Sequence, residues 1–189
     1  MLKLPAALAL FCAIAFPAFA ESLQERMAPC LACHGEKGQS ENPEVPSLGG
    51  QPAYYMLIQL YLFREKQRKI DVMVEMAKGL TDDDLRKFSD SLAVLPPPKP
   101  EDGPADAARM EHGKALAQQY HCNVCHQGDL SGVNNVPRLA AQREDYLLKA
   151  LREYKSNARV GYEPTMQEVM GPVKEGDIPD LAYAIARMK

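Results

Sequence analysis

The chain has 189 residues, of which 46% are hydrophobic and 25% are charged, and its formal net charge is -3. This length allows one ordinary domain or two small ones, and two small domains without any Trp would have thin cores. Charges of both signs are mixed along the chain and no block of Lys and Arg occurs. The composition therefore gives no indication of a nucleic-acid partner.

Residues 1–20 are predicted to be a secretory signal peptide. Lys3 supplies a short positive segment, residues 4–16 form an apolar run, and an Ala-x-Ala pattern predicts cleavage after Ala20. The apolar run is shorter than the roughly 20 residues that a membrane anchor needs. Cys12 would be removed with this segment. We therefore expect a soluble mature protein that is exported, most naturally to a bacterial periplasm.

The remaining cysteines fall in two Cys-x-x-Cys-His units, the attachment signature of a c-type haem. The units consist of Cys30, Cys33 and His34, and of Cys122, Cys125 and His126. Two residues between the cysteines let both sulfurs reach the two vinyl groups of one porphyrin. The adjacent His then lies where its imidazole can bind the iron. The sequence therefore predicts two covalently attached c-type haems, one at each unit.

Three other uses of these cysteines can be weighed. Exported cysteines usually form disulfides, and a thioredoxin-like Cys-x-x-Cys would also suit an oxidising compartment. Neither explains why His follows directly in both units. A four-cysteine zinc site usually has about 15–20 residues between its two pairs, and here the pairs lie much further apart. Haem attachment remains the best interpretation.

An internal repeat extends from each unit towards the C-terminus, because six residue types recur at one constant offset. They are Pro46, Leu48, Gln51, Tyr55, Leu60 and Arg68 in the first copy, and Pro137, Leu139, Gln142, Tyr146, Leu151 and Arg159 in the second. A final amphipathic helix follows in each copy, and Thr81 with Asp84 predicts a capping box at the first of them.

Helices dominate the predicted secondary structure, and no convincing strand pattern occurs. In chain order the predicted helices are 54–68, 81–93, 106–120, 142–156 and 176–188. The Pro run after the second helix favours an extended, semi-rigid connection. The sequence therefore predicts an all-α fold with a first domain at 21–95, a Pro-rich linker at 96–104 and a second domain at 105–189.

Each iron needs a second axial ligand, and Met is common in low-spin electron-transfer haems. Met73 and Met166 each lie eleven positions before the Asp near the start of the last helix of their copy. Met76 and Met170 do not match one another in this register. We therefore expect Met73 and Met166 to be the axial ligands, with Met76 and Met170 as fallbacks. Flexible core filling is expected of the other Met residues considered: Met27, Met56, Met110 and Met188.

The duplicated Cys-x-x-Cys-His, the Pro-x-Leu, the downstream Met and the final helix resemble class I cytochromes c. The tandem arrangement resembles the dihaem cytochrome c4 family over essentially the whole predicted mature chain. The resemblance implies two facing domains, each a few helices wrapped round one haem with His and Met ligands. It also implies that the carbonyls of Pro46 and Pro137 contact the two His rings and orient them.

One-electron transfer is the predicted function, with no catalytic residue, between respiratory redox partners. The donor would be a dehydrogenase or a quinol-oxidising complex, and the acceptor an oxidase or a reductase. Two alternatives stay open. The chain could be the dedicated cytochrome subunit of a larger dehydrogenase, which uses the same chemistry. It could also be a haem enzyme with one open iron position, although each copy contains a Met for that position.

Overall fold

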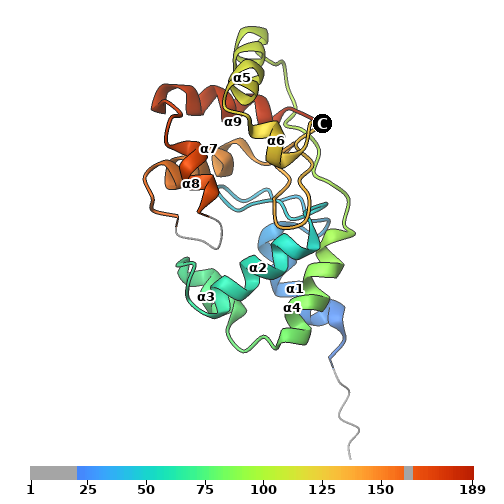
Figure 1. Cartoon of the computed structure of the whole chain (residues 1–189). Helices are drawn as coiled ribbons and strands as arrows, with labels where there is room; N and C mark the ends of the chain where they lie inside the picture. The colour runs from blue at the N-terminus through green and yellow to red at the C-terminus, as the bar shows by residue number, and fades with distance from the viewer. Residues whose placement is uncertain (1–20, 160–163) are drawn as a thin grey trace, which may run out of the picture.

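The computed structural model describes residues 21–159 and 164–189, so the predicted signal peptide lies outside the described residues. The described residues form α-helices, one short 3-10 helix and no strand, which confirms the all-α prediction. Figure 1 shows two lobes. The first half contains α1 (Leu23–His34), α2 (Ala53–Arg64), α3 (Asp71–Ala77) and α4 (Asp82–Ala93). The second half contains α5 (Ala107–Gln119), α6 (Cys122–His126), α7 (Glu144–Lys155), α8 (Thr165–Met170), η1 (Glu175–Asp177) and α9 (Ile178–Ala186).

The five predicted helices are present as α2, α4, α5, α7 and α9, with shorter bounds at several ends. α2 stops at Arg64 because Lys66 is left-handed, with φ 56°, and the chain turns there. α7 begins only at Glu144 because Ala141 is also left-handed, with φ 58°. Capping of α4 by Thr81 and Asp84 is confirmed, since each side chain accepts a hydrogen bond from the other's backbone N–H.

Four short or motif-bearing helices were not predicted: α1, α3, α6 and α8. α1 starts with a capping box between Ser22 and Glu25, and it continues through Pro29 into the first Cys-x-x-Cys-His unit. The second unit forms its own helix, α6, because left-handed His121 (φ 56°) separates it from α5. The helical approach to the first unit is therefore one helix shorter than the approach to the second.

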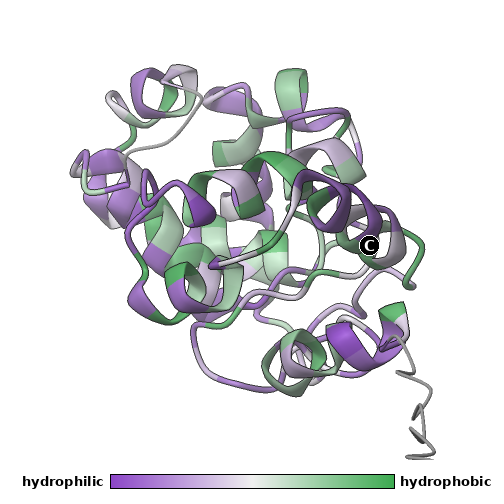
Figure 2. Ribbon diagram, turned by 90° about the horizontal axis from the view of Figure 1, so that it is seen from below, coloured by the Kyte–Doolittle hydropathy of each residue, from purple (hydrophilic) through white to green (hydrophobic). Residues whose placement is uncertain are grey.

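Each half packs its helices around its own hydrophobic cluster. In the first half α2 packs against α4, and in the second α9 packs against both α5 and α7. Figure 2 shows hydrophobic and hydrophilic residues alternating within single helices, as expected when one face of a helix is buried. The first cluster is built on Met27, Met56, Phe88 and Leu92. The second is larger and includes Leu116, Leu130, Leu147, Leu151, Met170, Ile178, Leu181 and Ile185.

The Pro-rich connection runs between the halves without helical structure and is hydrogen-bonded to both. Near its middle the N–H of Lys99 donates to the side-chain amide oxygen of Gln39 over 3.2 Å. At its far end the N–H of Glu101 donates to the carbonyl of Ala186 over 3.1 Å, and the Glu101 carboxylate pairs with Arg187. These contacts hold the segment against the protein surface, so it is not a free tether.

Candidate functional site

The last turn of α1 carries the first Cys-x-x-Cys-His unit. The His34 side chain is buried, and its Nδ1 is 2.7 Å from the carbonyl oxygen of Pro46. Because a carbonyl oxygen can only accept, the proton of this ring lies on Nδ1 and the lone pair lies on Nε2. Nε2 is therefore the atom that can bind a metal, and the Pro46 carbonyl fixes the orientation of the ring.

The second unit repeats this arrangement on α6. His126 is as buried as His34, and its Nδ1 donates to the carbonyl oxygen of Pro137 over 2.8 Å. The expected contacts of Pro46 and Pro137 with the two rings are thus confirmed. The repeat preserves this ligand geometry although α6 and α1 begin differently.

Burial keeps the ligand candidates neutral. It lowers the pKa of His34 and of His126, against a smaller raising effect of the Pro carbonyls. Burial also raises the pKa of the Cys30 and Cys122 thiols. A thioredoxin-like cysteine needs the opposite shift, because its reactive form is the thiolate. The environment of these thiols therefore suits a structural, covalent role.

All four cysteines outside residues 1–20 are free of disulfides. Cys30 and Cys122 are half-buried, and Cys33 and Cys125 are exposed. The two pairs lie in different halves, and the part of the chain that is described contains no group of three or more His, Cys, Asp or Glu that could hold a metal ion. The four-cysteine zinc alternative is therefore not formed, and a pair of thiols beside one buried His remains in each half.

The Met candidates differ in their surroundings. Met73 on α3 and Met166 on α8 are both half-buried, and Met166 packs against the second hydrophobic cluster. The two fallback residues differ in burial from this pair and from each other. Met76 is 40% exposed, whereas Met170 is 2% exposed and lies inside the core. The in-register pair thus shares the same intermediate burial, whereas the fallback pair does not.

The second half matches the family model described as cytochrome c, over residues 110–184. Cytochrome c4 of Stutzerimonas stutzeri is 31% identical over 168 residues, which cover 78% of this chain and 77% of that protein. The chain belongs to the cytochrome c4 family. Its fold agrees with the crystal structure of reduced recombinant cytochrome c4 from Pseudomonas stutzeri, with a TM-score of 0.80 and 26% identity. That match covers 88% of this chain and 97% of that chain.

A second kind of relative has a more specific name. The thiosulfate dehydrogenase electron acceptor of Thiomonas intermedia is 33% identical over 158 residues, covering 78% of this chain and 72% of that protein. As a member of the cytochrome c4 family, the chain consists of class I cytochrome c domains with two covalently bound c-type haems. It is an electron carrier and not an enzyme. Within the described ranges, no helix is both long and apolar enough to cross a membrane.

The two halves of this cytochrome c4 family member are joined by a reciprocal pair of Gln side chains. The amide of Gln142 accepts from the N–H of Ser47 over 2.8 Å and donates to the carbonyl of Ser47 over 2.9 Å. The amide of Gln51 makes the same two contacts with the backbone of Arg138, over 3.0 and 2.8 Å. Both Gln and both partners are repeat equivalents, so the halves exchange matching contacts. Sequence reasoning found the recurring Gln but gave it no role.

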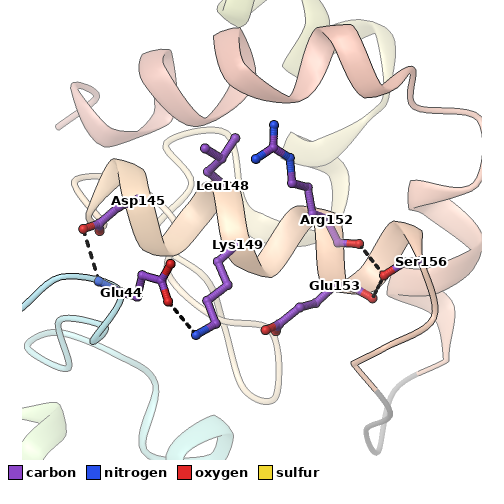
Figure 3. A pocket seen from close by; sticks show the side chains of 7 residues that line it. All are labelled: Glu44, Asp145, Leu148, Lys149, Arg152, Glu153 and Ser156. Atoms are coloured by element: carbon purple, nitrogen blue, oxygen red, sulfur yellow. Dashed lines mark hydrogen bonds and ion pairs between the residues drawn. The ribbon is translucent and has the colours of Figure 1, made fainter.

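Charged side chains reinforce the joint at the surface. The N–H of Glu44 donates to Asp145 over 3.1 Å, and the Glu44 carboxylate pairs with Lys149 over 2.8 Å (Figure 3). An open pocket of about 350 Å³ lies beside these residues along α7. Its lining acids and bases pair with groups of the protein itself, so we assign the pocket to the interface between the halves.

Proposed function

We propose that each half of the chain binds one haem through the residues that the sequence predicted. The proposed units are residues 21–95 and 105–189, connected by the linker at 96–104. The thiols would form the covalent links, and one His with one Met would bind each iron: Cys30, Cys33, His34 and Met73 in the first unit, and Cys122, Cys125, His126 and Met166 in the second. Met76 and Met170 fit less well, because one faces solvent and the other belongs to the core.

The observation that carries this proposal is the matched pair of His rings. His34 and His126 each donate Nδ1–H to a Pro carbonyl and keep Nε2 for a metal. A catalytic or thiolate site would not require the same hydrogen-bonded imidazole beside a pair of thiols in both halves. The residues present therefore fit haem c in both halves.

The protein's own residues orient the two His ligands and set their surroundings for electron transfer. When bound, haem supplies an iron that cycles between the ferrous and ferric states. The Pro carbonyls hold the imidazoles in one orientation, and only 6% of each of the two His residues is exposed. Fixed ligands reduce the rearrangement that accompanies a change of charge on the metal.

Two such units in one chain form a relay between a donor and an acceptor. We infer that the partners are redox proteins, with a dehydrogenase or quinol-oxidising complex as donor and an oxidase or reductase as acceptor. The relative from Thiomonas intermedia, named for accepting electrons from thiosulfate dehydrogenase, supports a dehydrogenase donor. It also favours the second candidate, a cytochrome dedicated to one dehydrogenase. Elution of the native protein as a free chain, rather than in a larger complex, would decide for the mobile carrier.

The proposed location is the bacterial periplasm. It is supported by the predicted export signal at residues 1–20 and by bacterial relatives of the cytochrome c4 family. The chemistry agrees, because thiols outside the cytosol are normally oxidised to disulfides unless another covalent use protects them. Cell fractionation with an antibody to the chain would test this location, and recovery in the cytosolic fraction would contradict it.

Haem counting tests the attachment sites. Protein produced with haem-maturation machinery should keep two haems per chain after denaturation, because thioether bonds survive unfolding. Replacing Cys122 and Cys125 together by Ser should leave one haem, and replacing Cys30 and Cys33 together should also leave one. Cys12→Ser is the matched control and should leave two. Extraction of all haem from the wild type into acidified organic solvent would refute the assignment.

A further inference from the structure

Two buried Arg side chains meet between the halves of the molecule. Arg68 follows α2 and Arg159 follows α7, and they occupy equivalent positions in the repeat. Their exposed fractions are only 8% and 7%. Both guanidinium groups approach the hydroxyl of Tyr146, at 3.5 Å from Arg68 and 3.2 Å from Arg159. One Tyr of the second half therefore contacts cations from both halves.

These two cations lack a hydrogen-bonded carboxylate among the described residues. Arg68 donates to the neutral amide of Gln59 over 2.7 Å. Nη1 of Arg159 is buried without a hydrogen-bond partner, and the carboxylate of Glu153 is 3.8 Å away, beyond hydrogen-bond distance. Burying a charge costs several kcal/mol unless it is paired and hydrogen-bonded. These two guanidinium groups could therefore be neutralised by a bound anion whose oxygens accept their hydrogen bonds.

A third guanidinium group, that of Arg138, also has a buried donor without an acceptor in the residues that the structure describes. Nε of Arg138 is also buried without a partner in the described part of the chain. Arg138 directly follows Pro137, whose carbonyl holds the ring of His126. Unsatisfied buried donors are rare in native proteins, and each calls for an explanation. Here one such donor belongs to the residue that follows Pro137, and another belongs to Arg159, which lies between the halves.

The surroundings of Arg68 and Arg159 favour a carboxylate that binds along the edge of the guanidinium plane. The face of Arg68 stacks on Phe63 at 4.6 Å, and that of Arg159 stacks on Tyr154 at 4.9 Å. Stacked faces leave the N–H groups at the edge, which match the two oxygens of a carboxylate. Burial opposes ionisation of Tyr146, yet the two guanidinium groups lower its pKa to about 8, so the centre of the cluster is strongly positive.

We propose that Arg68 and Arg159 bind propionate carboxylates of the two haems and so act as positioning residues between the halves. The inference rests on the proposed function, because haem is the carboxylate-bearing group that both halves share. The equivalent positions of the two Arg explain why one chain would need two such cations. Their charge also favours the reduced iron, since it offsets the negative charge of the propionates.

Infrared spectroscopy of the two-haem protein tests this proposal. Haem is labelled with a heavy carbon isotope in its propionate carboxylates, and reduced-minus-oxidised difference spectra are recorded for the wild type, Arg68→Gln and Arg159→Gln. We expect the labelled carboxylate bands to shift in both variants and the haem potentials to fall. Arg187→Gln is the matched control: Arg187 also stacks on a Tyr, at 3.8 Å from Tyr183, but its charge is already paired with Glu101 and Glu144.

The number of haems bound per chain distinguishes a failure of the propionate site from a failure of the proposed function. Unchanged labelled bands in variants that keep two haems would overturn the propionate site and leave the proposed function standing. A wild type without attached haem would overturn both. If the Gln variants do not fold, Arg68→Lys and Arg159→Lys replace them. These keep the charge but lose the paired N–H geometry, so unchanged bands there would also overturn the proposal.

Discussion

Each of the two buried His rings is fixed by one hydrogen bond, and that bond decides which nitrogen is available to a metal. Because Nδ1 donates to a Pro carbonyl in both halves, Nε2 has no proton. In the other tautomer the proton would lie on Nε2, and the lone pair of Nδ1 would face the carbonyl oxygen without a hydrogen bond. The recurring Pro therefore contributes to the metal site through its carbonyl and not through its ring.

Substitution of the Met residues tests the proposed axial ligands. A ferric haem with Met sulfur bound has a weak charge-transfer band at the red end of the visible spectrum, and Met73→Ala and Met166→Ala should each remove about half of its amplitude. Each variant should also bind carbon monoxide at the opened iron. Ready binding of carbon monoxide by the ferrous wild type would show that one iron lacks its Met ligand and would contradict the assignment.

The fallback residues serve as controls with distinct expectations. Met76→Ala should change neither the band nor the stability, because Met76 is 40% exposed. Met170→Ala should keep the band but lower the free energy of unfolding by about 2–5 kcal/mol, since it leaves a cavity in the core. Loss of the band in Met170→Ala, with the band intact in Met166→Ala, would show that the repeat register misassigns the ligand.

At the scale of single helices, the start of α4 depends on one carboxylate. Asp84 caps the helix with Thr81 and pairs with Arg26. The Arg26 hydrogen bond, together with the N–H of Thr81, holds the pKa of Asp84 well below its usual range. A carboxyl group with a lowered folded-state pKa stabilises the fold above its unfolded pKa, and this contribution is lost as the pH falls through the folded value.

Acid unfolding should therefore depend on Asp84. Stability of the first half should decrease as the pH falls below about 4, and Asp84→Asn should reduce this pH dependence while lowering stability at neutral pH. Thermal unfolding between neutral and acidic pH measures both effects. Asp83→Asn is the control, because Asp83 pairs with Lys87 on the exposed side of the same helix. Equal pH dependence in the wild type and Asp84→Asn would contradict the role given to this carboxylate.

The crossing of α5 and α9 requires a residue without a side chain. A Cβ added at Gly113 would lie 2.1 Å from the carbonyl oxygen of Asp180 and 2.5 Å from Cβ of Ala184. Gly113→Ala should therefore destabilise the second half by about 1–3 kcal/mol through overpacking, despite the better helix propensity of Ala. Urea unfolding measures the loss. Lys114→Ala, exposed on the same helix, should be neutral or slightly stabilising, and a stabilised Gly113→Ala would show that the helices can separate without cost.

On the scale of the whole molecule, buried polar contacts join the two halves. Ser47, Gln51 and Gln142 are all nearly inaccessible to water. Their hydrogen bonds run from a side chain of one half to the backbone of the other. The N–H of Tyr55, in the first turn of α2, also donates across the joint to the carbonyl of Asn134. Such contacts fix the relative orientation of the two proposed haem units.

Removing the two Gln amides should loosen this joint. Gln142→Leu leaves the N–H and carbonyl of Ser47 buried without partners, at a cost of about 1–3 kcal/mol for each group. Gln51→Leu does the same at Arg138. The double variant should unfold in two separate transitions in urea, and electron exchange between the haems should slow. The control Gln118→Ala changes an exposed Gln on α5 and should have no effect. A single transition at the wild-type midpoint in the double variant would refute the coupling.

Local patterns were enough to predict the all-α class, five of the helices and the two haem motifs. Each depends on spacing within a few residues: apolar periodicity, capping residues, or two cysteines followed by His. The short helices α3 and α8 were missed because their few residues carry too little periodicity. The roles of Gln51, Gln142, Arg68 and Arg159 could not be predicted, although all four recur in the repeat. Gln51 and Gln142 bind backbone groups of the other half, and Tyr146 brings Arg159 together with Arg68 of the other half. Only the folded arrangement brings such distant residues into hydrogen-bond range.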